Sequence, residues 1–161
     1  MQKDVFLLIG TNLGNRRQNL EQAIDLLDSD SVQVQQRSYI YKTAAWGKQD
    51  QPEFYNQVIE VATTLSPQGL LRYILSKEQQ MGRIRVEKWG ERVIDIDILL
   101  YGDFVLESPS LSIPHPQLPF RRFSLVPLAD LAPFQKHPVT GKTITQMLEE
   151  CPDPLKVTRL E

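Results

Sequence analysis

The chain has 161 residues, of which 41% are hydrophobic and 24% are charged, so it has the composition of an ordinary soluble domain that can bury a core without disulfide bonds. Its formal net charge of -2 argues against general attraction to nucleic acid or to an anionic membrane surface. The one cysteine, Cys151, cannot form an internal disulfide, and no early apolar run is long enough for a signal peptide or a membrane span. We therefore expect a single cytoplasmic domain over residues 1–161.

Apolar patterning predicts a strand, a helix and a second strand at the start of the chain. Residues 5–9 are continuously apolar, as in a buried central strand, and glycine and asparagine then mark a turn over residues 10–15. Apolar residues follow at helical spacing over residues 20–27. Valine, isoleucine and tyrosine residues indicate the second strand over residues 32–41.

A polar loop, a third strand and a second helix are predicted next. The loop covers residues 43–52, and the strand covers residues 54–64 with valine and isoleucine at its centre. Ser66 and Pro67 form a helix start, because serine caps helix N-termini and proline fits the first helical position. Apolar residues at helical spacing carry this helix to Gly82.

A charged loop over residues 83–91 leads into a fourth strand at residues 94–100. The resulting order, β-α-β-β-α-β, is the split βαβ arrangement of ferredoxin-like domains. We therefore predict an α+β fold, a ferredoxin-like βαββαβ sandwich with a four-stranded antiparallel sheet and helices packed on one face. A C-terminal extension of the same domain is expected to hold a short strand, a proline-rich loop and two helices, at residues 104–106, 111–119, 123–131 and 143–150.

The fourth strand carries the most informative pattern of the chain. Ile94, Ile96 and Ile98 alternate with Asp95 and Asp97, so both aspartates leave the same side of the strand with their Cα atoms roughly 6.5–7 Å apart. Carboxylate oxygens at this spacing suit one or two divalent cations such as Mg²⁺. For an isolated Asp-x-Asp pattern, a strand with one solvated face is the alternative interpretation.

Four basic residues precede the aspartates in the charged loop: Arg83, Arg85, Lys88 and Arg92. Such a loop is commonly just a solvated surface. Ahead of predicted metal ligands it favours a triphosphate site, because guanidinium groups hold the phosphate oxygens that metal ions bridge. The chain has no Gly-x-x-x-x-Gly-Lys-Ser/Thr element, which excludes a P-loop, and residues 10–14 are interpreted as a strand-to-helix turn that needs no ligand.

One histidine and several further residues are candidates for the same site. His115 lies between two prolines, which make its position reproducible, and Arg121 adds another phosphate-binding group. Phe54 and Phe123 are interpreted as core residues or, alternatively, as platforms for a flat heterocycle whose polar edge Asn56 could pair.

The residues resemble a known family, the 6-hydroxymethyl-7,8-dihydropterin pyrophosphokinases of the folate pathway. The family's signature, basic-x-Gly-x-Arg-x-x-Asp-aliphatic-Asp-aliphatic-aliphatic, is present over residues 88–99. Five further family-like fragments occur in order along nearly the whole chain: residues 10–14, 50–56, 82–85, 114–116 and 121–128. Fragments in this number and order make the resemblance specific.

The resemblance implies transfer of the β,γ-pyrophosphoryl group of ATP to the hydroxymethyl oxygen of a hydroxymethyl-dihydropterin, with release of AMP. It implies that Asp95 and Asp97 bind two Mg²⁺ ions and that Arg83 and Arg92 stabilise charge on the transferred group. The rest of the ATP site is implied to include the following residues: Glu78, Arg85, Trp89, Ile98, Ser112, His115 and Arg121. The pterin is implied to stack between Phe54 and Phe123. Its hydrogen-bonding edge is implied to be read by Asn56, by Thr43 and by the backbone of Ala44, Ala45 and Trp46.

Two other functions stay open at this point. A two-metal nucleotidyltransferase also uses paired aspartates on a strand, but it would release pyrophosphate, and its usual Gly-Ser turn shortly before the pair is not found here. A non-catalytic ferredoxin-like RNA-binding or regulatory module would need aromatic residues on the central strands and a basic face, whereas residues 5–9 offer only Phe6. We accordingly expect ATP and a pterin as partners, neither nucleic acid nor membrane, and a monomer.

Overall fold

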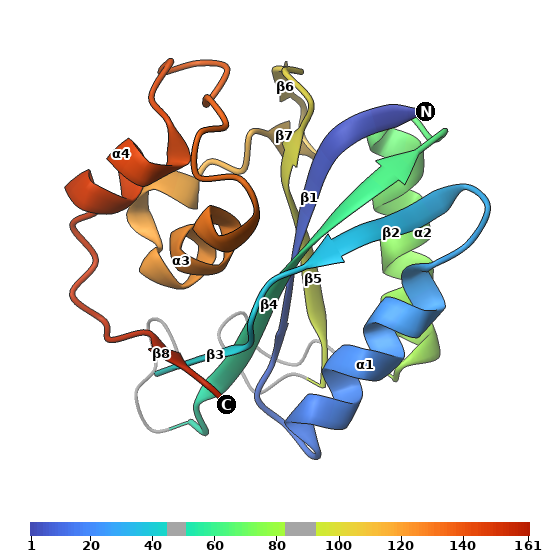
Figure 1. The fold of residues 1–161 in the computed structure, drawn as a ribbon. Helices are drawn as coiled ribbons and strands as arrows, with labels where there is room; N and C mark the ends of the chain where they lie inside the picture. The colour runs from blue at the N-terminus through green and yellow to red at the C-terminus, as the bar shows by residue number, and fades with distance from the viewer. Residues whose placement is uncertain (45–50, 83–92) are drawn as a thin grey trace.

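A computed structural model describes residues 1–44, 51–82 and 93–161 of the chain (Figure 1). The elements in chain order are β1 (Gln2–Thr11), α1 (Arg16–Leu27), β2 (Val32–Arg37), β3 (Tyr41–Thr43), β4 (Phe54–Thr63), α2 (Pro67–Gln80), β5 (Asp95–Tyr101), β6 (Leu106–Glu107), β7 (Ser112–Ile113), the short 3-10 helix η1 (Leu118–Phe120), α3 (Arg122–Leu131), α4 (Ile144–Glu150) and β8 (Thr158–Arg159). The predicted α+β class with a ferredoxin-like core is confirmed. None of the helices in the described ranges is long and apolar enough to span a membrane.

The main sheet is antiparallel throughout its pairings and has β1 and β4 as neighbouring inner strands. It contains six strands in the order β5-β1-β4-β3-β8, and β2 also pairs with β4. The prediction of four strands is therefore wrong in two places. The strand expected over residues 32–41 is divided into β2 and β3, and β8 adds a strand that the apolar pattern does not indicate.

Ser38 explains the division between β2 and β3. Its backbone N–H donates to the Val58 carbonyl at 2.8 Å, and its hydroxyl oxygen accepts the Val58 N–H at 2.9 Å, so a side chain takes a place in the ladder. The Ser38 carbonyl accepts a hydrogen bond from the buried Gln57 amide at 2.8 Å. Because these bonds satisfy the backbone locally, the chain can change register against β4 between the two strands.

Helices α1 and α2 cover one side of the sheet, which we call the α1/α2 face (Figure 1). Each helix is capped by the residue before it. Asn15 accepts the Gln18 N–H at 3.1 Å, and Ser66 accepts the Gly69 N–H at 3.1 Å. The buried cluster of this face is aliphatic in both layers and includes Val5, Leu7, Ile9, Leu20, Ile24, Ile59, Leu70, Ile74, Ile96 and Ile98.

The C-terminal extension covers the opposite side, the α3/α4 face (Figure 1). The prediction that the two helices of the βαββαβ core pack on one face is confirmed by α1 and α2, and the helices of the extension add a layer on the other face. α3 continues through Pro127 as predicted, and α4 begins after a Thr143 cap. A second buried cluster joins these helices to the sheet and includes Phe6, Leu8, Val58, Leu99, Leu100, Leu118, Leu125, Leu128, Ile144 and Met147.

Three smaller expectations for the extension are also corrected. β6 and β7 pair with each other in a separate two-stranded sheet and do not extend the main one. The segment 111–119, expected to be an irregular loop, contains β7 and the start of η1, and its Ile113–Pro114 peptide bond is cis. The helix expected to end the fold, α4, is followed by β8, which returns to pair with β3.

Candidate active site

The two aspartates of β5 lie on the α3/α4 face, beyond the end of its apolar cluster. On β1, β4 and β5 this cluster stops at Leu8, Val58 and Leu99, respectively. Asp95 and Asp97 are half-buried, and the isoleucines that alternate with them are buried against the opposite face. The prediction that both aspartates leave the same side of the strand is confirmed.

A row of paired residues runs across the sheet from Asp95. Asp95 is opposite Gly10 on β1, Gly10 is opposite Asn56 on β4, and Asn56 is opposite Tyr41 on β3. Directly opposed residues of antiparallel strands carry their side chains on the same face, so this row belongs to the α3/α4 face. A Cβ atom at Gly10 would lie 2.8 Å from Asn56 Oδ1 and 3.6 Å from Phe54 Cδ1. The contact with Phe54 would be ordinary van der Waals spacing, but a side chain at this position would force the Asn56 amide to move, so glycine lets Asn56 approach β1.

His115 stands beside the aspartates. Its Nε2 lies 4.0 Å from Asp97 Oδ1, and its Nδ1 accepts the Gln117 N–H at 3.1 Å, so the neutral ring carries its proton on Nε2. Burial and then the positive charge of Arg121 lower the pKa of His115 from 6.5 to about 4, against a smaller opposing effect of Asp95. The imidazole is therefore neutral at pH 7 and is a hydrogen-bond donor from Nε2.

Arg121 and Phe123 lie together at the start of α3. The Arg121 Cζ is 5.6 Å from the centroid of the Phe123 ring, a favourable arrangement of a guanidinium group over an aromatic face. Phe123 is half-buried against the apolar cluster of the α3/α4 face. Because Arg121 acts electrostatically on His115, this pair belongs to the same group of side chains as the histidine and the aspartates.

The predicted pterin residues of β4 lie next to Gly10, and Thr43 of β3 lies one strand further across the sheet. Asn56 is 3% exposed, and its Nδ2 has no hydrogen-bond partner among the residues that the structure describes. A buried amide donor in this state is uncommon and indicates a group that a ligand completes. Thr43 is opposite Phe54, and its hydroxyl donates to the Lys156 carbonyl at 3.2 Å, so its lone pairs are what it can offer a ligand. Ala44, at the end of the first described range, is half-buried.

Three residues that the family resemblance assigns to ATP lie around β5. Glu78 of α2 is 3% exposed, and its Oε2 accepts the Ile96 N–H at 2.7 Å, so this carboxylate holds the backbone between the two aspartates. The Ile98 side chain is buried in the cluster of the α1/α2 face, which leaves its main chain for any contact with ATP. Ser112 is half-buried on β7 opposite Glu107. Their contacts with ATP stay predictions.

The structure brings the aspartates, His115 and Arg121 into one group and sets Thr43, Phe54 and Asn56 on the same face of the sheet. Other predicted site residues lie outside the described ranges: Ala45, Trp46, Arg83, Arg85, Trp89 and Arg92. Their roles stay predictions.

Gly10 is the functional position that the sequence interpretation missed. It is interpreted there as part of a turn, whereas β1 continues to Thr11 and holds Gly10 within the strand. A glycine directly after a continuous apolar strand is the signal that could have shown this, because glycine within a strand often marks a close approach of another group.

Asp95 and Asp97 are the described residues that suit a divalent cation. Within the three described ranges, no group of three or more histidine, cysteine, aspartate or glutamate side chains could hold a metal ion. A pair of carboxylates nevertheless matches Mg²⁺, which is commonly held by one or two carboxylates and completes its shell with phosphate oxygens and water.

The fold and the site together define a ferredoxin-like α+β domain that carries a carboxylate pair, a neutral histidine and an arginine on one face of its sheet. The sequence model of the 7,8-dihydro-6-hydroxymethylpterin-pyrophosphokinase (HPPK) family matches residues 6–133. The chain belongs to this family. The family predicted from the sequence is thereby confirmed, and so is the predicted class of enzyme, an ATP-dependent pyrophosphokinase of folate biosynthesis.

Similar proteins come from several organisms. The 2-amino-4-hydroxy-6-hydroxymethyldihydropteridine pyrophosphokinase of Synechocystis is 43% identical over 143 residues, which are 88% of this chain and 73% of the relative. The protein of the same name from Methylorubrum extorquens is 38% identical over 157 residues, 97% of this chain and 98% of the relative. A solved Plasmodium falciparum HPPK-DHPS structure has a TM-score of 0.76 at 20% identity and supports the fold alone. This chain spans 45% of that longer chain.

Proposed function

We propose that this chain transfers the β,γ-pyrophosphoryl group of ATP to the hydroxymethyl oxygen of 6-hydroxymethyl-7,8-dihydropterin, with Asp95, Asp97, His115 and Arg121 at the ATP end of the site. Family membership and the names of the relatives support this reaction. The arrangement of an ATP end and a pterin end on one face rests on one observation, the row that leads from Asp95 through Gly10 to the buried amide of Asn56.

The reaction forms a bond between the hydroxymethyl oxygen and the β-phosphorus. It breaks the bond between the β-phosphorus and the oxygen shared with the α-phosphorus, so that AMP leaves. Asp95 and Asp97 would hold the two Mg²⁺ ions that the family resemblance implies. Bound Mg²⁺ supplies neutralisation of phosphate charge and lowers the pKa of the attacking hydroxyl. The protein residues act in such transfers mainly through position and fixed charge.

His115 and Arg121 contribute to this end of the site in different ways. His115 is neutral at pH 7, so its Nε2–H donates a hydrogen bond to a phosphate oxygen without adding a second positive charge beside Arg121. Arg121 supplies the fixed positive charge and a fork of donors that matches phosphate oxygens. Arg83 and Arg92, which lie outside the described ranges, keep their predicted role on the transferred group.

The pterin ring stacks between Phe54 and Phe123 in this proposal, and the Asn56 Nδ2 donates to its polar edge. The unpartnered buried amide and the missing side chain at Gly10 support the position of the ring over this part of the sheet. Thr43 can accept a hydrogen bond from the ring, and the main chain of residues 44–46 keeps its predicted place at the same edge.

The reaction is tested by phosphorus NMR of the full chain with ATP, Mg²⁺ and the hydroxymethyl-dihydropterin. We expect AMP and a pterin diphosphate to accumulate together. Free pyrophosphate with a nucleotide-linked product would favour the nucleotidyltransferase alternative instead. Without the pterin, we expect ATP to be stable, which separates transfer from hydrolysis.

The pterin subsite is tested by Asn56→Leu, which keeps the branched shape and the number of heavy atoms of the side chain and removes its amide. The dissociation constant of the pterin, measured by fluorescence titration, should rise about tenfold to a hundredfold, the effect of losing a buried hydrogen bond. The affinity for an ATP analogue serves as the control and should stay unchanged. Equal loss of both affinities would contradict a specific role for Asn56.

The cytoplasmic location and the absence of nucleic-acid and membrane partners remain predictions from composition, which the one cysteine and the net charge of -2 support. The monomeric state also remains a prediction.

A further inference from the structure

The last residues of the chain contact both sides of the proposed pterin subsite. The C-terminal segment, residues 151–160, follows α4 and lies beyond residue 133, where the match to the family model ends. It runs from the start of α3 to the edge of β3 that faces away from β4 (Figure 1). Its contacts at these two ends differ in kind and are described in turn.

At the first end, Asp153 takes the place of a helix cap for α3. Arg121, the residue before the helix, makes no side-chain capping bond. Instead Oδ2 of Asp153, which is 6% exposed, accepts the Arg122 N–H at 3.0 Å. The Arg122 side chain donates back to the carbonyls of Asp153 and Cys151, each at 3.1 Å. A carboxylate at a helix N-terminus satisfies an otherwise unpaired N–H and meets the positive end of the helix dipole.

At the second end, the segment pairs with β3. β8 pairs with Tyr41 and Lys42, and the Leu160 N–H donates to the Ile40 carbonyl at 2.9 Å. The Lys156 carbonyl accepts the hydroxyl of Thr43, the residue opposite Phe54. The segment therefore connects the strand beside Phe54 to the helix that begins beside Phe123.

The other end of α3 is tied to the same strand. The Tyr41 hydroxyl donates to the Asp130 carboxylate, at 2.8 Å to Oδ2 and 3.0 Å to Oδ1. Burial and this carboxylate raise the pKa of Tyr41, which keeps the hydroxyl protonated and a donor. With its last turn attached through Tyr41, α3 is held at both ends, and its first turn depends on Asp153.

We propose that Asp153 is a positioning residue for the pterin subsite, which fixes the first turn of α3 and thereby the Phe123 ring of that subsite and the Arg121 guanidinium next to it. This proposal rests on the proposed function. Arg122, the residue that Asp153 holds, stands directly between Arg121 and Phe123. Without an acceptor for its first N–H, the first turn of a helix frays, and both flanking side chains lose their fixed place.

The main test is Asp153→Ala in the full chain. We expect the dissociation constant of the pterin, measured by fluorescence titration well below the unfolding temperature, to rise about three- to thirtyfold, the range that follows from the loss of a helix cap. Asp153→Asn keeps one acceptor oxygen and should give an intermediate loss. In steady-state kinetics the KM for the pterin should rise more than kcat falls.

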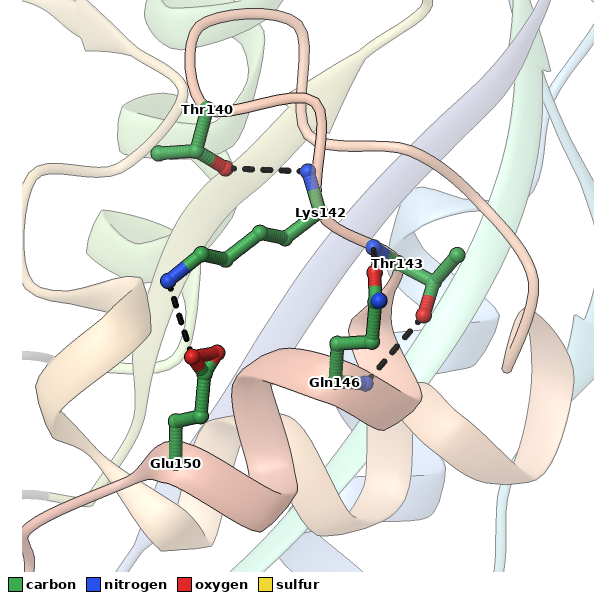
Figure 2. A network of polar contacts seen from close by, with 5 residues as sticks. All are labelled: Thr140, Lys142, Thr143, Gln146 and Glu150. Atoms are coloured by element: carbon green, nitrogen blue, oxygen red, sulfur yellow. Dashed lines mark hydrogen bonds and ion pairs between the residues drawn. The ribbon is translucent and has the colours of Figure 1, made fainter.

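The matched control is Thr143→Ala, which removes the side-chain cap of α4, supplied there by the residue before the helix. Figure 2 shows this capping box, in which Thr143 Oγ1 accepts the Gln146 N–H at 3.1 Å and Gln146 Oε1 accepts the Thr143 N–H at 2.8 Å. The lost cap should lower the unfolding temperature in a comparable way, but α4 contributes none of the proposed site residues. We expect unchanged pterin affinity. An equal loss of affinity in Thr143→Ala would overturn the proposal, because general destabilisation would then explain both variants.

A double-mutant cycle shows whether Asp153 acts through Phe123. In a Phe123→Ala background, Asp153→Ala should weaken pterin binding by less than about twofold, because the group that it positions is gone. Fully additive losses would overturn the proposal. If Phe123→Ala alone leaves pterin binding intact, the proposed pterin subsite itself is wrong. If Phe123→Ala weakens binding and Asp153→Ala does not, only the positioning role is wrong.

Discussion

The two faces of the sheet differ in what they hold, although alternate residues of the same strands build both. On β1, Val5, Leu7 and Ile9 are buried in the cluster of the α1/α2 face. The alternate positions pass from Phe6 and Leu8 in the second cluster to Gly10 in the candidate site. One face is apolar along the strand, and the other changes from core to site within two residues.

This difference shows how the site obtains a rigid base. β5 presents Asp95 and Asp97 on one side while its isoleucines are buried on the other, so the strand that carries the proposed metal ligands is held by a packed core. A site on such a strand is held more firmly than one on a loop. The comparison predicts that activity and stability can be changed separately by substitutions on opposite faces.

The largest effect is expected at Asp97 on the site face. Asp97→Asn removes a proposed metal ligand, so turnover should fall by at least about a hundredfold, since metal ligation is worth several kcal/mol in such reactions. The free energy of unfolding should change little, because asparagine keeps the volume and most of the hydrogen-bonding capacity. Steady-state kinetics and urea unfolding measure the two quantities. Asp103→Asn, an exposed aspartate just after β5, is the control and should be active. Near-normal turnover in Asp97→Asn would contradict the metal assignment.

The converse effect is expected at Leu7 on the α1/α2 face. Leu7 is fully buried, so Leu7→Ala should lower the free energy of unfolding by about 2–5 kcal/mol. Below the unfolding transition, kcat and KM should match those of the parent protein, because the site lies on the other side of the strand. Urea unfolding and kinetics at the same temperature provide the comparison. A parallel fall in kcat would show that the two faces are not independent.

The sequence predicted the α1/α2 face well because its signals are local. Three signals each involve residues that are close in sequence: the N-terminal start of α2 at Ser66 and Pro67, the helical spacing of leucines, and the alternation around Asp95. The sequence motifs that the family resemblance joined also contain the four site residues that the structure groups together, namely Asp95, Asp97, His115 and Arg121. Their arrangement on one face could be derived for the aspartates alone, because strand alternation is a local rule.

The strand edge beyond β4 and the cap of α3 were not predicted, because their determinants are distant in sequence. The break at Ser38 depends on Val58 and Gln57, and the cap of α3 comes from Asp153, 31 residues after the residue it holds. β8 consists of two residues and has no apolar pattern of its own. Backbone pairing and side-chain bonds of this kind leave no periodic signal, so they emerge only when the chain is folded.

A smaller effect is expected at Glu78, which connects the two faces. Its carboxylate reaches from α2 to the Ile96 N–H between the aspartates. Glu78→Ala leaves that buried N–H without this acceptor and should destabilise the protein by about 1–3 kcal/mol. Because the strand between the ligands is then less fixed, the affinity for a magnesium complex of an ATP analogue should fall about tenfold, as for other supports of metal ligands. Calorimetry measures this affinity, and Glu78→Gln, which keeps an acceptor oxygen, should show a smaller change. Unchanged nucleotide affinity in Glu78→Ala would limit its role to stability.

The smallest effect is expected at Glu60, a carboxylate on β4 opposite Phe6, at the far end of the α3/α4 face from the aspartates. Burial, and then the negative charge of Asp4, raise the pKa of Glu60 above 4.5. A raised pKa means that the folded state binds the proton more tightly than the unfolded state. The stability contributed by Glu60 is therefore greatest below pH 4.5 and is lost as the pH rises through the folded-state value. Glu60→Gln should raise the free energy of unfolding at pH 7, within about 0.5 kcal/mol, the range of substitutions outside packed cores. In urea unfolding at pH 4 the two proteins should be equally stable. A gain of the same size at both pH values would show that the charge of Glu60 is not its cause.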